Sequence, residues 1–235
     1  MNAAELLEQI KDLGKESYKK VLLKHGIVEP VYGASIEDMK KLVKGIKKDY
    51  ELSKALYATG VYDAMYLAGL IADDMAMTQE DLQEWVEKAN CTMIAECTVA
   101  WVASEGRFGE EMAAIWIESD REIIATAGWS TYRSLATIKM DSELNMDQIS
   151  GLLDRIAKTI HSEPNRVRHV MNSYIANVGT YIAPLTDKAI ETAKRVGPVM
   201  VNMGDTSCKV PDPIEVIEKV RLRGAIGKKR KTAKC

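Results

Sequence analysis

Apolar residues recur at helical spacing along almost the whole chain. Two segments keep the pattern i, i+3, i+4, i+7 without interruption, and they are Ile149, Leu152, Leu153, Ile156, Ala157 and Ile160, followed by Val167, Val170, Met171, Tyr174, Ile175 and Val178. The same period occurs over shorter stretches at residues 35–46, 51–59, 61–73, 78–89, 92–104, 108–118, 121–138 and 182–196. This pattern predicts roughly a dozen amphipathic helices.

The predicted helices come in pairs. Short polar turns separate them, and each pair takes up about 35–40 residues, a period typical of helical repeats. A helix pair cannot bury its apolar stripe alone, so successive pairs must stack on one another. We therefore predict an all-α fold, a HEAT- or armadillo-like α-solenoid (an α-α superhelix). An irregular globular helical bundle is the alternative that the pattern leaves open.

The helical period is lost between residues 197 and 212. Residues 199–203 alternate as a strand does, and the pair Gly204 and Asp205 has the composition of a turn. The segment therefore predicts a small β-hairpin near residues 199–210. A short helix that begins near Pro213 is expected to follow it.

Charge is distributed unevenly along the chain. The 32 basic and 34 acidic residues nearly balance, but residues 221–235 contain seven Lys or Arg and no Asp or Glu. A dense cationic segment repels itself, gains little by folding back on apolar surface, and is attracted to polyanions. We expect one solenoid domain, residues 1–220, and a basic C-terminal tail, residues 221–235. Its candidate phosphate contacts are Lys228, Lys229, Arg230 and Lys231. A solubilising tail without a ligand is the alternative.

Several protein classes are disfavoured by what the sequence lacks. The longest uncharged run, residues 170–186, includes Asn, Ser, Gly and Pro and is a poor membrane span. Four Cys without a C-x-x-C pair, and only three His, indicate neither a metal site nor a disulfide framework. The amino-terminal residues do not resemble a signal peptide, and residues 227–232 lack P-loop spacing. We expect a cytoplasmic protein with no membrane partner, metal or nucleotide cofactor.

Four short segments carry a resemblance to a known family. They are Val31–Ile36 (VYGASI), Met39–Leu42 (MKKL), Glu51–Tyr57 (ELSKALY) and Ala64–Ala68 (AMYLA). They resemble motifs of the DNA alkylation repair family, the HEAT-like repeat alkylpurine DNA glycosylases and their relatives, and the likeness extends over residues 30–195. The resemblance implies a curved all-helical solenoid whose concave, basic face binds DNA.

The resemblance also implies a particular chemistry. Active members of the family cut the N-glycosidic bond of cationic alkylated purines without a metal or nucleotide cofactor. A Trp-Trp-Asp segment supplies a carboxylate beside the cleaved bond, and a second Trp and an Arg line the same cleft. The matching positions of this chain are Cys91, Ala95, Asn172 and Thr126, none of which is Trp, Asp or Arg. The resemblance therefore supports the fold and DNA association more than glycosylase catalysis.

Glu96 is the candidate acid of a rearranged site. It lies one residue from the expected Asp position, in the apolar stretch Met93–Val102. Burial among apolar neighbours raises the pKa of a carboxyl group and fits it for acid or base catalysis. The alternative is that Glu96 faces solvent on the polar side of an amphipathic helix.

Two further clusters are candidate DNA contacts. Trp129, Tyr132 and Arg133 lie within about one helical turn and are expected to line a groove. Trp85, Trp101 and Trp116, by contrast, have core spacing. The second cluster, Arg166, Arg168 and His169, opens a helix after Asn165, a plausible N-cap, so the helix terminus and two guanidinium groups point at the same phosphate. A solvated helix end is the alternative.

We predict a DNA-binding protein that recognises damaged or branched DNA through its phosphate backbone and lacks the glycosylase residues of its relatives. Two alternatives stay open. One is an alkylpurine DNA glycosylase with a rearranged site around Glu96, and the other is a helical-repeat scaffold that binds another protein.

Overall fold

The computed structural model describes residues 2–234, and that part of the chain contains helices but no β-strand. Cys235 lies outside the described residues. The α-helices are, in chain order, α1 (Ala3–Asp12), α2 (Glu16–Lys24), α3 (Ile36–Leu42), α4 (Tyr50–Tyr57), α5 (Tyr62–Ile71), α6 (Gln79–Lys88), α7 (Thr92–Ile94), α8 (Ala100–Glu105), α9 (Gly109–Trp116), α10 (Glu122–Ile138), α11 (Met146–Thr159), α12 (Asn165–Tyr181), α13 (Thr186–Val196) and α14 (Pro213–Leu222). A π-helical turn, η1 (Ala95–Val99), joins α7 to α8, and three short 3-10 turns are η2 (Asp141–Glu143), η3 (Ile160–Ser162) and η4 (Ala183–Leu185).

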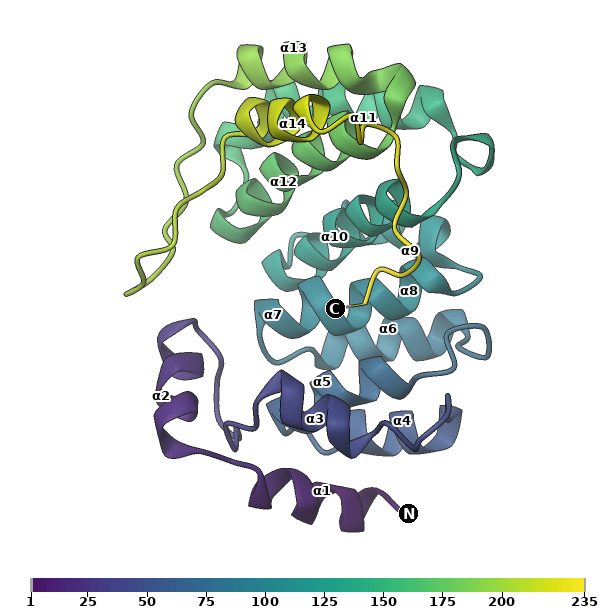
Figure 1. The fold of residues 1–235 in the computed structure, drawn as a ribbon, viewed down its shortest axis with the longest axis vertical. Coiled ribbons are helices and arrows are strands. Elements are labelled where there is room, and N and C mark those ends of the chain that lie inside the picture. The colour runs from purple at the N-terminus through teal and green to yellow at the C-terminus, as the bar shows by residue number, and fades with distance from the viewer. Residues whose placement is uncertain (1, 235) are drawn as a thin grey trace.

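The helices stack as antiparallel pairs in two rows (Figure 1). One row consists of α5, then α7 with η1 and α8, then α10 and α12, and we call it the inner row. The second row consists of α4, α6, α9, α11 and α13, which pack against the inner row. Consecutive pairs bury each other's apolar stripes, which is the arrangement that the helical period predicted.

Two clusters of buried side chains fill the space between the rows. The first belongs to the N-terminal half and contains Trp85, Trp101 and Trp116, each at most 4% exposed, as their spacing predicted. The second belongs to the C-terminal half and contains the apolar faces of α11 and α12. Ser35 and Thr78 cap the starts of α3 and α6, because each side chain accepts a hydrogen bond from the backbone N–H three residues later.

The β-hairpin predicted near residues 199–210 is absent, and this prediction was wrong. The backbone there pairs with a side chain instead of with a second strand. The amide N–H of Asn202 donates to Asn165 Oδ1, and Asn165 Nδ2 donates to the Asn202 carbonyl. The alternation at 199–203 arises because Val199 and Val201 pack on the C-terminal core. Residues 197–212 therefore form an extended loop. Asn165 holds that loop, and Pro164 occupies the N-cap position of α12.

The basic tail does not extend into solvent. Its first two residues complete α14, the helix predicted to begin near Pro213, whose Ile217 is fully buried. Residues 225–234, which we call the strap, then fold back across the inner row toward the N-terminal half (Figure 1). A cationic segment gains little from contact with apolar surface, and the strap is held instead by helix-end carbonyls and carboxylates.

No helix within residues 2–234 has both the length and the apolar character needed to cross a bilayer.

Candidate nucleic-acid interface

A shallow groove of about 290 Å³ lies on the inner row, with the strap as one wall. Helix α10 contributes Arg133, Ser134 and Thr137 to its lining, and α12 contributes Ser173 and Asn177. The remaining lining residues are Cys97, Trp101, Arg230 and Ala233. Among residues 2–234, the lining therefore includes two arginines and no carboxylate side chain.

Helical spacing explains the polar floor of the groove. Arg133 and Thr137 are four residues apart on α10, as Ser173 and Asn177 are on α12, so each pair lies on one face of its helix. Asn177 Nδ2 donates to Thr137 Oγ1 at 2.9 Å and ties the two helices together. Within the described chain Arg133 has no carboxylate partner, so its half-buried guanidinium group presents its charge to the groove.

Glu96 and Arg166 form an ion pair beside this groove. Arg166 donates to Glu96 Oε1 from Nε at 2.9 Å and from Nη2 at 2.5 Å. The Glu96 side chain is 7% exposed and that of Arg166 is 22% exposed. The backbone N–H of Arg166 also donates to Glu122 Oε1 at 2.6 Å, so the start of α12 is held by two carboxylates.

The interpretation that Glu96 faces solvent was wrong, and the reason is local. Glu96 belongs to the π-helical turn η1, in which the hydrogen bonds span five residues instead of four. Such a turn changes the rotation per residue, so directions derived from a regular α-helix are displaced there. Glu96 is consequently buried. Its negative charge and the positive charge of Arg166 offset each other in the ion pair.

His169 lies one turn further along α12. Burial lowers the pKa of its imidazole below the ordinary value, and the nearby Arg166 and Arg133 lower it further, while Glu96 opposes the shift. The ring is therefore neutral at pH 7 and adds no positive charge to the interface. Its Nδ1 is buried and has no hydrogen-bond partner among residues 2–234.

The remaining residues of the two predicted DNA-contact clusters do not all face the groove. Arg168 is half-buried, and its Nη2 lies 3.5 Å from Asn165 Oδ1 instead of joining Arg166 at Glu96. Trp129 is 1% exposed and packs edge-on against Tyr174, with Arg155 over its ring. The trio of Trp129, Tyr132 and Arg133 is thus divided, because only Arg133 lines the groove.

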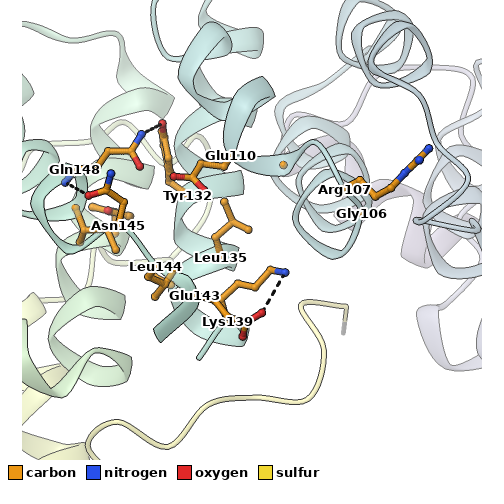
Figure 2. Close-up of a pocket in the computed structure, with 14 residues that line it drawn as sticks. Gly106, Arg107, Glu110, Tyr132, Leu135, Lys139, Glu143, Leu144, Asn145 and Gln148 are labelled. Atoms are coloured by element: carbon orange, nitrogen blue, oxygen red, sulfur yellow. Dashed lines mark hydrogen bonds and ion pairs between the residues drawn. The ribbon is translucent and has the colours of Figure 1, made fainter. Parts of the chain in front are cut away.

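Tyr132 lines a second cavity, of about 180 Å³, that shares no residue with the groove. Figure 2 shows it beside Gln148, whose Nε2 donates to the Tyr132 hydroxyl at 2.9 Å. Burial, with the nearby Glu110 and Glu118, raises the pKa of Tyr132 to about 12. The phenol therefore stays protonated at neutral pH and belongs to the packing between α10 and α11.

The four basic residues proposed as phosphate contacts differ in their surroundings. Lys228, Arg230 and Lys231 have exposed side chains. Lys229 is largely buried, donates to the carbonyl of Ala136 at 3.0 Å, and forms an ion pair with Asp141 at 2.8 Å. The strap therefore contains both anchoring and solvent-facing cations, a division that a run of Lys and Arg does not reveal.

The positions that match the glycosylase residues are buried. Cys91, Ala95, Thr126 and Asn172 are each at most 4% exposed, and Asn172 Nδ2 donates to the Pro211 carbonyl. Within residues 2–234, no group of three His, Cys, Asp or Glu side chains is arranged to hold a metal ion.

The groove, the strap and the paired Glu96 belong to a helical-repeat protein whose groove is lined by Arg133 and Arg230. A family model described as DNA alkylation repair enzyme matches residues 5–203, and the chain belongs to that family. Two similar proteins are Lin0241 of Listeria innocua, 35% identical, and Lmo0209 of Listeria monocytogenes, 34% identical. Each match spans 210 residues, or 87% of this chain and 90% of the Listeria protein.

A solved structure resembles the whole chain. It comes from a study of a new family of proteins related to the HEAT-like repeat DNA glycosylases with affinity for branched DNA structures. The two chains are 37% identical, the match covers 100% of both, and the TM-score is 0.92. The fold is therefore that of the HEAT-like repeat proteins, as the resemblance implied, and the irregular bundle is excluded.

Proposed function

We propose that this protein binds DNA, branched DNA in preference to linear duplex, through phosphate contacts on its inner row, and that it does not excise bases. The observation that carries the proposal is the groove between α8, α10, α12 and the strap. Its described lining combines two arginines with small hydroxyl and amide side chains and includes no carboxylate side chain. Such a surface suits a sugar–phosphate strand, because phosphate contacts position nucleic acid without reading its sequence.

The relatives support the choice of ligand. The structurally similar protein belongs to a family with affinity for branched DNA structures, and that likeness extends over the whole of this chain. We extend branched-DNA binding to this protein because the inner row, from which the groove is built, lies within the matched residues.

The state of Glu96 argues against glycosylase chemistry. A carboxylate that stabilises a cationic sugar must offer its negative charge to the cleaved bond. Here Arg166 donates two hydrogen bonds to Glu96 Oε1. The pair leaves little negative charge for a transition state, and the positions matching the family's Trp, Asp and Arg are Cys91, Ala95 and Thr126.

Fluorescence anisotropy of labelled DNA at increasing salt tests the binding. The logarithm of the association constant should fall linearly with the logarithm of salt concentration, by about 0.9 for each phosphate contact. A three-way junction should displace a linear duplex of equal length and composition. Arg133→Gln should reduce the slope by about one contact, whereas Arg195→Gln, an exposed change on α13, should leave it unchanged.

The outcomes separate the alternative functions. Absence of binding to duplex, branched and single-stranded DNA at low salt would leave the protein-binding scaffold. Incubation with DNA that carries methylated purines tests excision, and we expect no released base above spontaneous depurination. Release that disappears in Glu96→Gln would instead establish a glycosylase with a rearranged site.

A further inference from the structure

We propose that the strap is a phosphate-binding rim of the groove, fixed in place because it caps the carboxyl ends of the inner-row helices. This inference rests on the proposed DNA binding and adds where along the inner row the phosphates lie. It assigns separate tasks to the basic residues of the strap, some of which anchor it while others bind the DNA backbone.

The strap follows the helix ends in order. The N–H of Gly227 donates to the Thr180 carbonyl at the end of α12, at 2.9 Å, and that of Arg230 donates to the Thr137 carbonyl at the end of α10, at 3.0 Å. Farther on, the N–H of Ala233 donates to the side chain of Glu105, the last residue of α8, at 2.7 Å. Carbonyls in the last turn of a helix lack intrahelical partners, so the bonds to Thr180 and Thr137 satisfy groups that otherwise require water.

Without the strap this edge of the inner row would be anionic. Helix carboxyl ends carry partial negative charge. Three carboxylates lie along the same edge, namely Asp141 next to α10, Glu105 at the end of α8, and Asp74 after α5. Lys229 pairs with Asp141, and Lys234 pairs with Asp74, which Lys48 also binds. The strap thus reduces the negative charge of an edge that would repel a phosphate backbone.

The remaining cations of the strap face outward. Lys228, Arg230 and Lys231 are exposed and have no carboxylate partner within the described chain. Arg230 lines the groove, so the rim and the groove are continuous. On its other side Arg230 joins Lys228, Lys229 and Arg223 around a shallow depression of about 300 Å³ at the end of α12. None of the described residues that line this depression is acidic, so it suits a phosphate group.

The course of the strap depends on two glycines. Gly224 and Gly227 have φ values of 62° and 79°, in the left-handed region that glycine adopts readily. They turn the chain away from α14 and onto the end of α12. The ordered path places the exposed cations at fixed positions, which a disordered basic arm would not do.

A triple variant tests the rim directly. Lys228→Gln, Arg230→Gln and Lys231→Gln combined should weaken binding of a labelled three-way junction at least about tenfold and lower the slope against salt by about 2–3. The matched control is Lys11→Gln, Lys88→Gln and Lys158→Gln, which removes the same charge from exposed positions on α1, α6 and α11. Equal binding by the two triple variants would overturn the inference. No binding by the unaltered protein would instead overturn the proposed function.

A second variant separates a positioned rim from a simple excess of charge. Glu105→Ala removes the acceptor of Ala233 and of the Thr232 hydroxyl, and it also removes a negative charge. Charge alone predicts tighter DNA binding, whereas a detached rim predicts weaker binding. We expect weaker binding, and a tighter complex would contradict the positioning of the strap.

Discussion

Lys234 Nζ lies 2.7 Å from Asp74 Oδ1, although the two residues are 160 positions apart in the chain. Asp74 is completely buried, and the Lys234 side chain is 11% exposed. Lys48 donates to the other carboxylate oxygen. Beside this pair, Ala233 packs into the N-terminal core cluster, so the end of the strap joins the C-terminal half of the solenoid to the N-terminal half.

The first prediction concerns this junction. Lys234→Met should lower the free energy of unfolding by about 1–3 kcal/mol, because a buried carboxylate loses one of its two cationic partners. Lys231→Met, three residues earlier and exposed, should change it by less than about 0.5 kcal/mol. Urea denaturation followed by circular dichroism measures both. Equal effects on the free energy of unfolding would show that the ion pair between Lys234 and Asp74 does not stabilise the fold.

The second prediction concerns Glu96. Glu96→Gln removes a negative charge beside the groove and releases the Arg166 guanidinium group, so DNA should bind more tightly, with a salt slope larger by about one contact. The control is Glu118→Gln, which removes a carboxylate that is also paired with an arginine, Arg155, away from the groove. Anisotropy titrations compare the two variants. Weaker binding by Glu96→Gln would indicate that DNA does not bind near Glu96.

The third prediction uses the pKa of His169, which burial lowers. The unfolded chain takes up a proton near the ordinary value of about 6.5, whereas the folded protein does so only at lower pH. The stability associated with neutral His169 is therefore complete above about pH 6.5 and is lost as the pH falls through the folded-state pKa. Urea midpoints at pH 7.5 and below pH 6 should differ less in His169→Asn than in the unaltered protein. The control is His25→Asn, at an exposed site, and it should keep the full pH dependence. An unchanged pH dependence in His169→Asn would contradict the prediction.

The fourth prediction concerns packing within the inner row. A Cβ atom at Gly69 of α5 would lie 2.8 Å from Thr98 Cγ2 in η1, so Gly69→Ala should destabilise the protein by about 1–3 kcal/mol. Gly151 on α11 has open space around it, and Gly151→Ala should stabilise the protein by about 0.5–1 kcal/mol. Thermal unfolding of the two variants measures these opposite shifts, and shifts of the same sign would contradict the packing described for α5 and η1.

Much of the fold was predictable because helical periodicity reports burial directly. The runs at α11 and α12 keep their apolar faces for several turns, and those faces form the C-terminal core. The incorrect prediction of a β-hairpin also arose from a pattern that reports burial. Alternation at residues 199–203 also reports burial on one side, but it does not identify the partner of the backbone, which is the side chain of Asn165.

The site was less predictable because its geometry depends on contacts between distant segments. A π-helical turn rotates Glu96 inward, and the partner that neutralises it is Arg166, 70 residues away. The composition of the tail indicated attraction to polyanions. It could not indicate that carbonyls at the ends of α10 and α12 would hold the tail along the inner row. Ser173 and Asn177 also line the groove, and their spacing of one turn on α12 is the sequence signal for that polar face.

The proposed function requires that DNA lie in the groove on the inner row. Photochemical cross-linking from a single position detects such contact, with a benzoyl-phenylalanine residue placed at Ser173, in the groove, or at Lys158, on the exposed side of α11. After irradiation with labelled three-way junction DNA, we expect a covalent protein–DNA product from position 173 and none from position 158. A product from position 158 alone, while binding persists in both proteins, would contradict the proposed function.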